Sequence, residues 1–239
     1  MYSSFENQKV VIAGGSSGIG LATATILAKE KAHVTITGRS AGRLADAAKT
    51  APGVHTAAID SNNRPSLDEF FTSHGEIDHL VLALSGAKGA GTFADLSLKD
   101  LREGFEGKFW PQLETLQAAL PYVKKTGSIT VITAASAVLQ APGVSGLAAI
   151  NGSLELMIPS LAKEIQPLRI NAVSPGVIDT PWWDMMPADV KAQTFEQYAS
   201  QTPVGRIGRP EEVAHSIIFL MANGNITGTI IRCDGGLSL

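Results

Sequence analysis

A glycine-rich turn near the N-terminus carries the first residues with a recognisable chemical use. It follows the apolar run Lys9–Ala13 and includes Gly14, Ser16, Ser17, Gly18, Ile19 and Gly20. Glycines let the backbone approach a phosphate closely, and the N-terminus of a following helix offers N–H groups with partial positive charge. The turn therefore predicts a pyrophosphate-binding site, although a tight strand-to-helix loop would use the same glycines.

A second chemical signal lies about 20 residues further on, where dinucleotide-binding folds that prefer NAD place an acidic residue. The segment between Glu30 and Asp46 contains no acidic residue, and it offers Arg39 and Ser40 instead. An arginine fork pairs with a ribose 2′-phosphate through charge-assisted hydrogen bonds. The alternative is a solvated surface arginine. We expect Arg39 and Ser40 to bind phosphate, and therefore NADP in preference to NAD.

Short apolar runs alternate with helical patterns along the whole chain. The runs that predict strands are Lys9–Ala13, His33–Thr37, Val54–Ala58, His79–Leu84, Ser128–Thr133, Arg169–Val173 and Gly228–Arg232. Helical patterns cover residues 18–30, 40–50, 65–74, 98–122, 144–166 and 209–222. This alternation predicts an α/β fold: a Rossmann-type, doubly wound parallel sheet with helices on both faces. Because no repeat or linker interrupts it, residues 1–239 are expected to form a single domain.

Composition limits the partners. The 239 residues are 44% hydrophobic and carry a net charge of −3, which gives no reason to expect nucleic acid or a membrane surface as a partner. The apolar stretch Ser128–Ile150 is broken by Gln140 and Pro142, so we do not expect it to span a membrane. One cysteine, Cys233, fits a reducing compartment and a cytoplasmic protein. No metal site is expected, and three histidines are interpreted as strand-edge or surface residues: His55, His79 and His215.

These motifs resemble those of the short-chain dehydrogenase/reductase family over essentially the whole chain. The segment from Ala13 to Gly20 is similar to the family's Thr-Gly-x-x-x-Gly-Ile-Gly motif, and Arg169 to Thr180 is similar to its Arg-Val-Asn-x-Val-x-Pro-Gly-x-x-x-Thr stretch. The resemblance implies homodimers or homotetramers formed through the helices at about 98–122 and 144–166. It also implies further cofactor-binding residues, namely Asp60, Ser61, Pro175, Gly176, Ile178 and Thr180. Of these, Asp60 would hold the adenine amino group, while Ile178 and Thr180 would hold the nicotinamide carboxamide.

The departures from the family pattern concern catalysis. Its members use an Asn-Ser-Tyr-Lys tetrad, whose positions align with Lys108, Ala134, Leu147 and Asn151. Hydride transfer to a carbonyl creates an alkoxide, which needs a proton donor and hydrogen-bond donors. Leu147 supplies neither, whereas Asn151 could still bind the nicotinamide ribose.

Lys108 is the main candidate to replace the missing groups. If the alignment holds, it faces the active-site pocket, where its ammonium could bind the ribose or donate a proton. The alternative is a lysine that extends to solvent or pairs with Glu103 or Glu106. Ser136 could supply a hydroxyl, although a plain loop serine is the simpler interpretation, and Thr133 is a weaker candidate.

The segment after Thr180 is the candidate substrate lid, at about residues 181–203. Its large apolar residues are Trp182, Trp183, Met185 and Met186. They would cover a hydrophobic substrate, or else pack against the core or another subunit. The prediction is an oxidoreductase that moves a hydride between NADP(H) and a small or medium apolar carbonyl or alcohol. The alternative is a non-catalytic NADP(H)-binding sensor or interaction protein.

Overall fold

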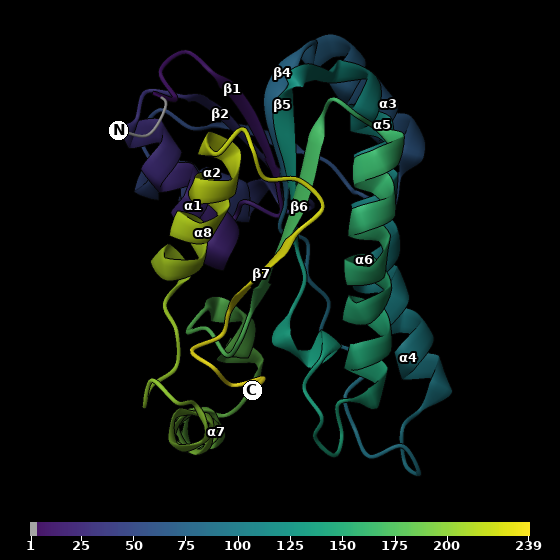
Figure 1. Ribbon diagram of the computed structural model, residues 1–239. Helices are drawn as coiled ribbons and strands as arrows, with labels where there is room; N and C mark the ends of the chain where they lie inside the picture. The colour runs from purple at the N-terminus through teal and green to yellow at the C-terminus, as the bar shows by residue number, and fades with distance from the viewer. Residues whose placement is uncertain (1–3) are drawn as a thin grey trace.

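In a computed structural model that describes residues 4–239, a parallel seven-stranded sheet lies between two layers of helices (Figure 1). The strands are β1 (Lys9–Ala13), β2 (His33–Gly38), β3 (His55–Ala58), β4 (Ile77–Leu82), β5 (Val123–Ile132), β6 (Arg169–Pro175) and β7 (Ile230–Cys233). Their order across the sheet is β3-β2-β1-β4-β5-β6-β7. The predicted Rossmann-type α/β fold and its seven strands are therefore confirmed.

The helices lie between successive strands in the chain. The α-helices are α1 (Gly18–Lys29), α2 (Ala41–Thr50), α3 (Arg64–His74), α4 (Leu98–Gly104), α5 (Trp110–Ala119), α6 (Ser145–Glu164), α7 (Ala188–Gln201) and α8 (Pro210–Ala222). Shorter helical turns are η1 (Phe105–Phe109), η2 (Leu120–Tyr122), η3 (Ala135–Ala137) and η4 (Pro181–Met185). Within residues 4–239, no helix combines the length and apolar character needed to cross a bilayer.

Alternation along the strands builds a hydrophobic core on each face of the sheet. In β1, Val10 and Ile12 belong to the core covered by α1, α2 and α8, whereas Val11 and Ala13 belong to the core covered by α3, α5 and α6. Successive strand residues point to opposite faces, so a doubly covered strand must be apolar throughout. Figure 1 shows the two helical layers on either side of the sheet.

The sheet order reverses direction between β1 and β4, which are hydrogen-bonded neighbours. The loops that follow these strands consequently lie side by side at the carboxyl edge of the sheet. A Cβ placed on Gly14, after β1, would lie 2.5 Å from the carbonyl oxygen of Ala83, after β4. In open α/β sheets, ligands bind in the crevice at such a switch point.

The predicted helix at 98–122 is not one continuous α-helix. It contains α4, the π-helical turn η1, α5 and the 3-10 turn η2. The N–H of Trp110 donates to the carbonyl of Phe105, five residues back, as in a π-helix. Pro111 has no N–H to continue the α pattern, and this favours the wider turn.

The interpretation of His79 as a strand-edge or surface residue is wrong. His79 is 6% exposed and lies in β4, between β1 and β5. Its Nδ1 is 2.7 Å from Ser128 Oγ, and its Nε2 is 2.7 Å from Gln8 Oε1. Because both ring nitrogens have partners, the histidine is tolerated among apolar side chains.

Candidate functional site

The glycine-rich turn has the close backbone approach that a phosphate site needs. Gly14 and Gly18 have φ values of +84° and +53°, which favour glycine. Gly20 has no room for a side chain, because a Cβ there would clash with the Gly14 carbonyl. The Ser17 hydroxyl makes no capping hydrogen bond to α1, so it leaves the N–H groups of the first helical turn to another acceptor.

The residues after β2 and β3 lie beyond this turn along the same edge. Arg39 is exposed, and no partner for its guanidinium is found within residues 4–239. Ser40 caps α2, since its Oγ accepts a hydrogen bond from the Arg43 N–H at 3.3 Å. Asp60 accepts from the Asn62 N–H at 3.1 Å, while Ser61 is 6% exposed. Arg39 therefore keeps its donors for a ligand, while Ser40 already uses its oxygen.

The segment from Pro175 to Thr180, at the end of β6, approaches the glycine turn at the same edge of the sheet. A Cβ placed on Gly18 would lie 3.1 Å from Thr180 Cγ2. Gly176 lies against Asp234, where a Cβ would be 2.9 Å from the Asp234 Cα. The fold thus brings Gly18 and Thr180 together, although they are far apart in the sequence.

Lys108 is buried, with 9% of its surface exposed, and it lies in η1. Its Nζ donates to the Thr133 carbonyl at 2.9 Å. Burial lowers the pKa of Lys108 to about 8, and the charge of Glu155 acts in the opposite direction. Within residues 4–239 this is its one hydrogen bond, so two of its three N–H donors have no acceptor there.

The alternative interpretation of Lys108, as a solvent-directed lysine paired with Glu103 or Glu106, is wrong. Glu103 lies 3.9 Å from Lys88 and 3.9 Å from Lys99, while Glu106 is exposed. Lys108 lies within the π turn η1, and its ammonium finds the Thr133 carbonyl in place of a glutamate on its own helix. Lys108 therefore points inward, toward the end of β5.

Glu155 is a polar residue of the site that the sequence analysis did not single out. Its Oε1 accepts from Thr133 Oγ1 at 2.8 Å and from Ser174 Oγ at 2.7 Å. It lies on α6 four residues after Asn151, a spacing that puts both on one helix face. A carboxylate beside the buried residues Leu154 and Ile158 was the signal that could have identified it.

Asn151, Ser136 and Leu147 form a second group. The Asn151 Nδ2 donates to Ser136 Oγ at 3.1 Å and to the Leu147 carbonyl at 3.1 Å. Asn151 is 3% exposed, and its Oδ1 has no hydrogen-bond partner in the described chain. Ala134 follows Thr133 and carries no side-chain donor. An orphaned buried acceptor such as Asn151 Oδ1 points to a missing hydroxyl donor.

Two tryptophans of the lid segment hydrogen-bond to backbone carbonyls outside it. The Trp182 Nε1 donates to the Gly86 carbonyl at 3.2 Å, and the Trp183 Nε1 donates to the Ile178 carbonyl at 3.0 Å. Gly86 lies against Gly107, the residue before Lys108: a Cβ on Gly86 would be 3.2 Å from the Gly107 carbonyl carbon. Met185 is 58% exposed, and Met186 is partly buried.

Comparison with known proteins assigns this arrangement to a family. Residues 13–238 match the family model for enoyl-(acyl carrier protein) reductase. The chain is also 31% identical to the 3-oxoacyl-(acyl-carrier-protein) reductase FabG of Thermotoga maritima, over 97% of this chain and 98% of that protein. The chain belongs to the short-chain dehydrogenase/reductase family. The resemblance of the sequence motifs to this family is confirmed.

Two solved structures of short-chain enzymes share the whole fold. A small-chain dehydrogenase in complex with NADPH superimposes with a TM-score of 0.84 at 29% identity, covering 98% of this chain and 99% of that one. A short-chain oxidoreductase of Pseudomonas aeruginosa that contains an atypical catalytic center gives a TM-score of 0.88 at 26% identity, covering 99% of each chain.

The short-chain dehydrogenase/reductase family binds a nicotinamide cofactor, and the residues of this chain fit one. In the glycine turn, the missing side chains at Gly14 and Gly20 allow the backbone to pack closely, and the first N–H groups of α1 have no side-chain cap and remain for a phosphate. The orphaned Oδ1 of Asn151 is a matching acceptor for a ribose hydroxyl.

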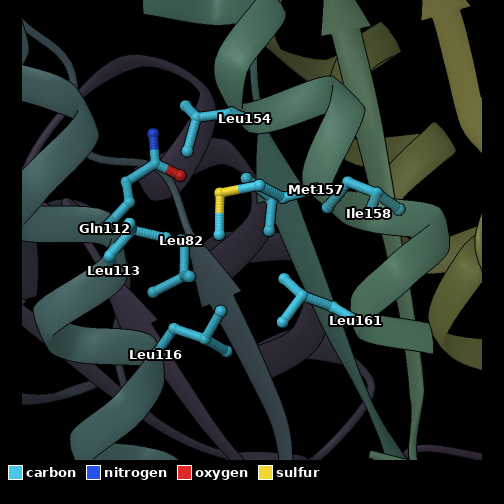
Figure 2. A pocket seen from close by; sticks show the side chains of 9 residues that line it. Leu82, Gln112, Leu113, Leu116, Leu154, Met157, Ile158 and Leu161 are labelled. Carbon is cyan, nitrogen blue, oxygen red and sulfur yellow. The ribbon is translucent and has the colours of Figure 1, made fainter. Parts of the chain in front are cut away.

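The apolar groove between α5 and α6 is separate from these residues. Figure 2 shows that side chains from the two helices point toward one another over Leu82 of β4. The groove is lined by Leu82, Gln112, Leu113, Leu116, Val131, Leu154, Met157, Ile158 and Leu161. With one polar side chain in its lining, it offers little to orient a polar substrate.

Proposed function

We propose that this protein is an oxidoreductase that transfers a hydride between NADP(H) and a small or medium apolar carbonyl or alcohol, using a non-standard active site. The observation that carries the proposal is the buried Lys108 in η1, whose ammonium keeps two N–H donors for a ligand. The similarity to a Pseudomonas aeruginosa oxidoreductase with an atypical catalytic center supports it.

The preference for NADP rests on Arg39. Its guanidinium is exposed, carries no partner within residues 4–239, and follows β2, where the ribose 2′-phosphate would lie. The glycine turn, Asp60 with Ser61, and the Pro175–Thr180 segment would hold the rest of the dinucleotide. The similarity to a dehydrogenase that binds NADPH supports this assignment. When bound, the cofactor supplies or accepts the hydride.

Lys108 would supply the proton that the reaction needs. In our alignment Ala134 and Leu147 stand where the family has serine and tyrosine, and neither side chain can donate a hydrogen bond. The Lys108 ammonium would give one proton to the alkoxide as it forms and then regain one from water. Its pKa of about 8 keeps it protonated at neutral pH and makes it a better acid than an ordinary lysine. Asn151 would hold the ribose, with Ser136 fixing its amide.

The lid proposal concerns residues 181–203. Trp182, Trp183, Met185 and Met186 would cover the substrate, since the Trp182 ring bridges from η4 to Gly86 beside η1. Their apolar surface favours an apolar substrate. We also propose a homodimer or homotetramer through α4–α5 and α6, where Trp110 and Leu156 are 46% and 82% exposed. A cytoplasmic location stays a prediction.

The test is NADPH consumption, followed by absorbance, over a broad panel of carbonyl compounds. Wild type, Lys108→Met and the exposed-site control Lys163→Met are compared at saturating NADPH. We expect turnover in wild type and the control, with a loss of about 10²–10⁴ in Lys108→Met because one general acid is removed. NADPH binding by all three proteins without turnover in any would instead support the cofactor-binding sensor.

A further inference from the structure

Glu155 joins the ends of two neighbouring strands. Its Oε1 accepts hydrogen bonds from Thr133, which follows β5, and from Ser174 in β6. Thr133 and Ser174 are 1% and 0% exposed. A carboxylate in such surroundings is stable only when it is hydrogen-bonded or paired with a positive charge. The two hydroxyl donors meet the first condition, and the positive charge of Lys108 acts on the carboxylate from beyond contact distance.

Thr133 connects Glu155 to Lys108. Its hydroxyl donates to Glu155 at 2.8 Å, while its carbonyl accepts from Lys108 Nζ at 2.9 Å. One residue thus bonds to both charged groups, and its backbone position fixes the direction of the Lys108 side chain. The carboxylate lies beyond direct contact with the ammonium, so it leaves the remaining N–H donors free for a ligand.

The other charged groups around η1 are engaged elsewhere or exposed. On α4, Asp100 and Glu103 lie within 3.3 Å and 3.9 Å of Lys88. On α5, Glu114 lies 3.6 Å from Arg64. Glu106 of η1 itself is exposed.

The remaining charges on the elements around η1 are more distant from Lys108. On α6, Lys163 and Glu164 are exposed near the far end of the helix. On β5, Lys124 pairs with Asp78, and Lys125 is exposed. Glu155 is therefore the charged group that acts on Lys108.

We propose that Glu155 is a positioning residue for this reaction: its carboxylate fixes Thr133 and Ser174 and, through Thr133, serves as the counter-charge that keeps Lys108 a protonated donor. The inference rests on the proposed function, because that function needs Lys108 to stay protonated although it is buried. Lys108 of η1 and Glu155 of α6 would together take the place of the family's tyrosine and lysine.

The experiment measures the protonation of Lys108 directly, in the absence of cofactor. Protein labelled with ¹³C at lysine Cε is titrated by NMR, and the Lys108 resonance is assigned by its loss in Lys108→Met. Glu155→Gln keeps an oxygen acceptor for the two hydroxyls but removes the charge. We expect the midpoint of about 8 to fall by roughly one pH unit in Glu155→Gln, because an opposite charge is lost. An unchanged midpoint would overturn the proposal.

Two further variants separate positioning from folding. Glu164→Gln removes an exposed carboxylate from the same helix and should leave the midpoint unchanged. Glu155→Asp keeps the charge and should retain most of the wild-type midpoint, even if Glu155→Gln folds poorly. A drop of the Lys108 midpoint in Glu155→Asp as large as the drop in Glu155→Gln would also overturn the proposal.

Turnover supplies the second readout. Because Lys108 must be protonated to reduce a carbonyl, the alkaline fall of kcat should move to lower pH in Glu155→Gln by the same amount as the NMR midpoint. A shifted NMR midpoint with no turnover in wild type would refute the proposed function and leave the charge pairing in place. A shifted midpoint with an unshifted kcat profile would overturn the positioning role.

Discussion

Lys108 and His79 are two buried ionisable side chains near opposite ends of the same central strands. His79 lies in β4 toward the amino ends, and both ring nitrogens have partners at 2.7 Å. Lys108 lies at the carboxyl end of β5, where its Nζ donates one hydrogen bond to the Thr133 carbonyl. Burial lowers the pKa of both groups, to about 4 for His79 and to about 8 for Lys108.

The difference between these two regions separates a structural polar group from a functional one. A fully partnered histidine completes the fold, whereas a buried ammonium with unused donors is complete only with a ligand. A neighbouring hollow is not the criterion, because the structural residue His79 borders an open one of about 480 Å³ with Gln8 and Arg169. Arg169 there donates to three backbone carbonyls, those of Leu220, Met221 and Ile226.

The largest expected effect concerns His79 and stability in acid. Its pKa is about 4 in the folded protein and 6.5 ordinarily, so the unfolded chain binds more protons between these values. The contribution of His79 to the free energy of unfolding is therefore fully present above pH 6.5 and falls by about 3 kcal/mol as the pH drops to 4. Urea unfolding at pH 7 and pH 4.5 should show a weaker pH dependence in His79→Leu than in wild type.

The exposed His215→Asn variant is the control for that experiment. It should keep the wild-type pH dependence, because the substitution leaves the buried His79 and its two hydrogen-bond partners in place. Equal pH dependence in His79→Leu and wild type would show that the buried histidine does not set acid stability.

A smaller effect is expected for Arg39, an exposed residue of the carboxyl edge. Arg39→Ala should weaken NADPH binding about tenfold or more, because hydrogen bonds to a charged group contribute on the order of 1.5–3 kcal/mol. NADH binding and the melting temperature should hardly change, since Arg39 has no partner among the described residues. Fluorescence titration with both cofactors checks this, and an equal loss for NADH would argue against 2′-phosphate recognition.

The smallest expected effect is a change in the free energy of unfolding when Lys108 itself is replaced. Because its folded pKa lies below the usual 10.5, the unfolded state holds the proton more tightly, so Lys108 destabilises the fold increasingly as the pH falls from 10.5 to 8 and fully below pH 8. Lys108→Met should therefore raise the free energy of unfolding by roughly 1 kcal/mol, although its turnover falls. A destabilised Lys108→Met protein would mean that the lysine, like His79, serves the fold.

Much of the architecture could be predicted because it depends on local patterns. Apolar β-branched runs identified the seven strands, and the glycine turn after Lys9–Ala13 was recognised from its spacing. The network around Glu155 was not predicted, because Thr133 and Ser174 reach it from two strands that only the fold brings together. His79 was misjudged for the same reason: its partners Gln8 and Ser128 lie on other parts of the chain.

The π turn η1 has a consequence for the whole length of the helix at 98–119. Each residue of an α-helix turns the chain by about 100°, so one residue accommodated in a wider turn offsets the two halves by about that angle. The segments on either side can then face different neighbours: α4 contacts α6, whereas α5 packs on α3 and faces α6 across the apolar groove. Deleting one residue from Phe105–Phe109 would restore a regular helix and rotate Lys108 away from Thr133. Segments α4 and α5 could then no longer both keep their present packing partners.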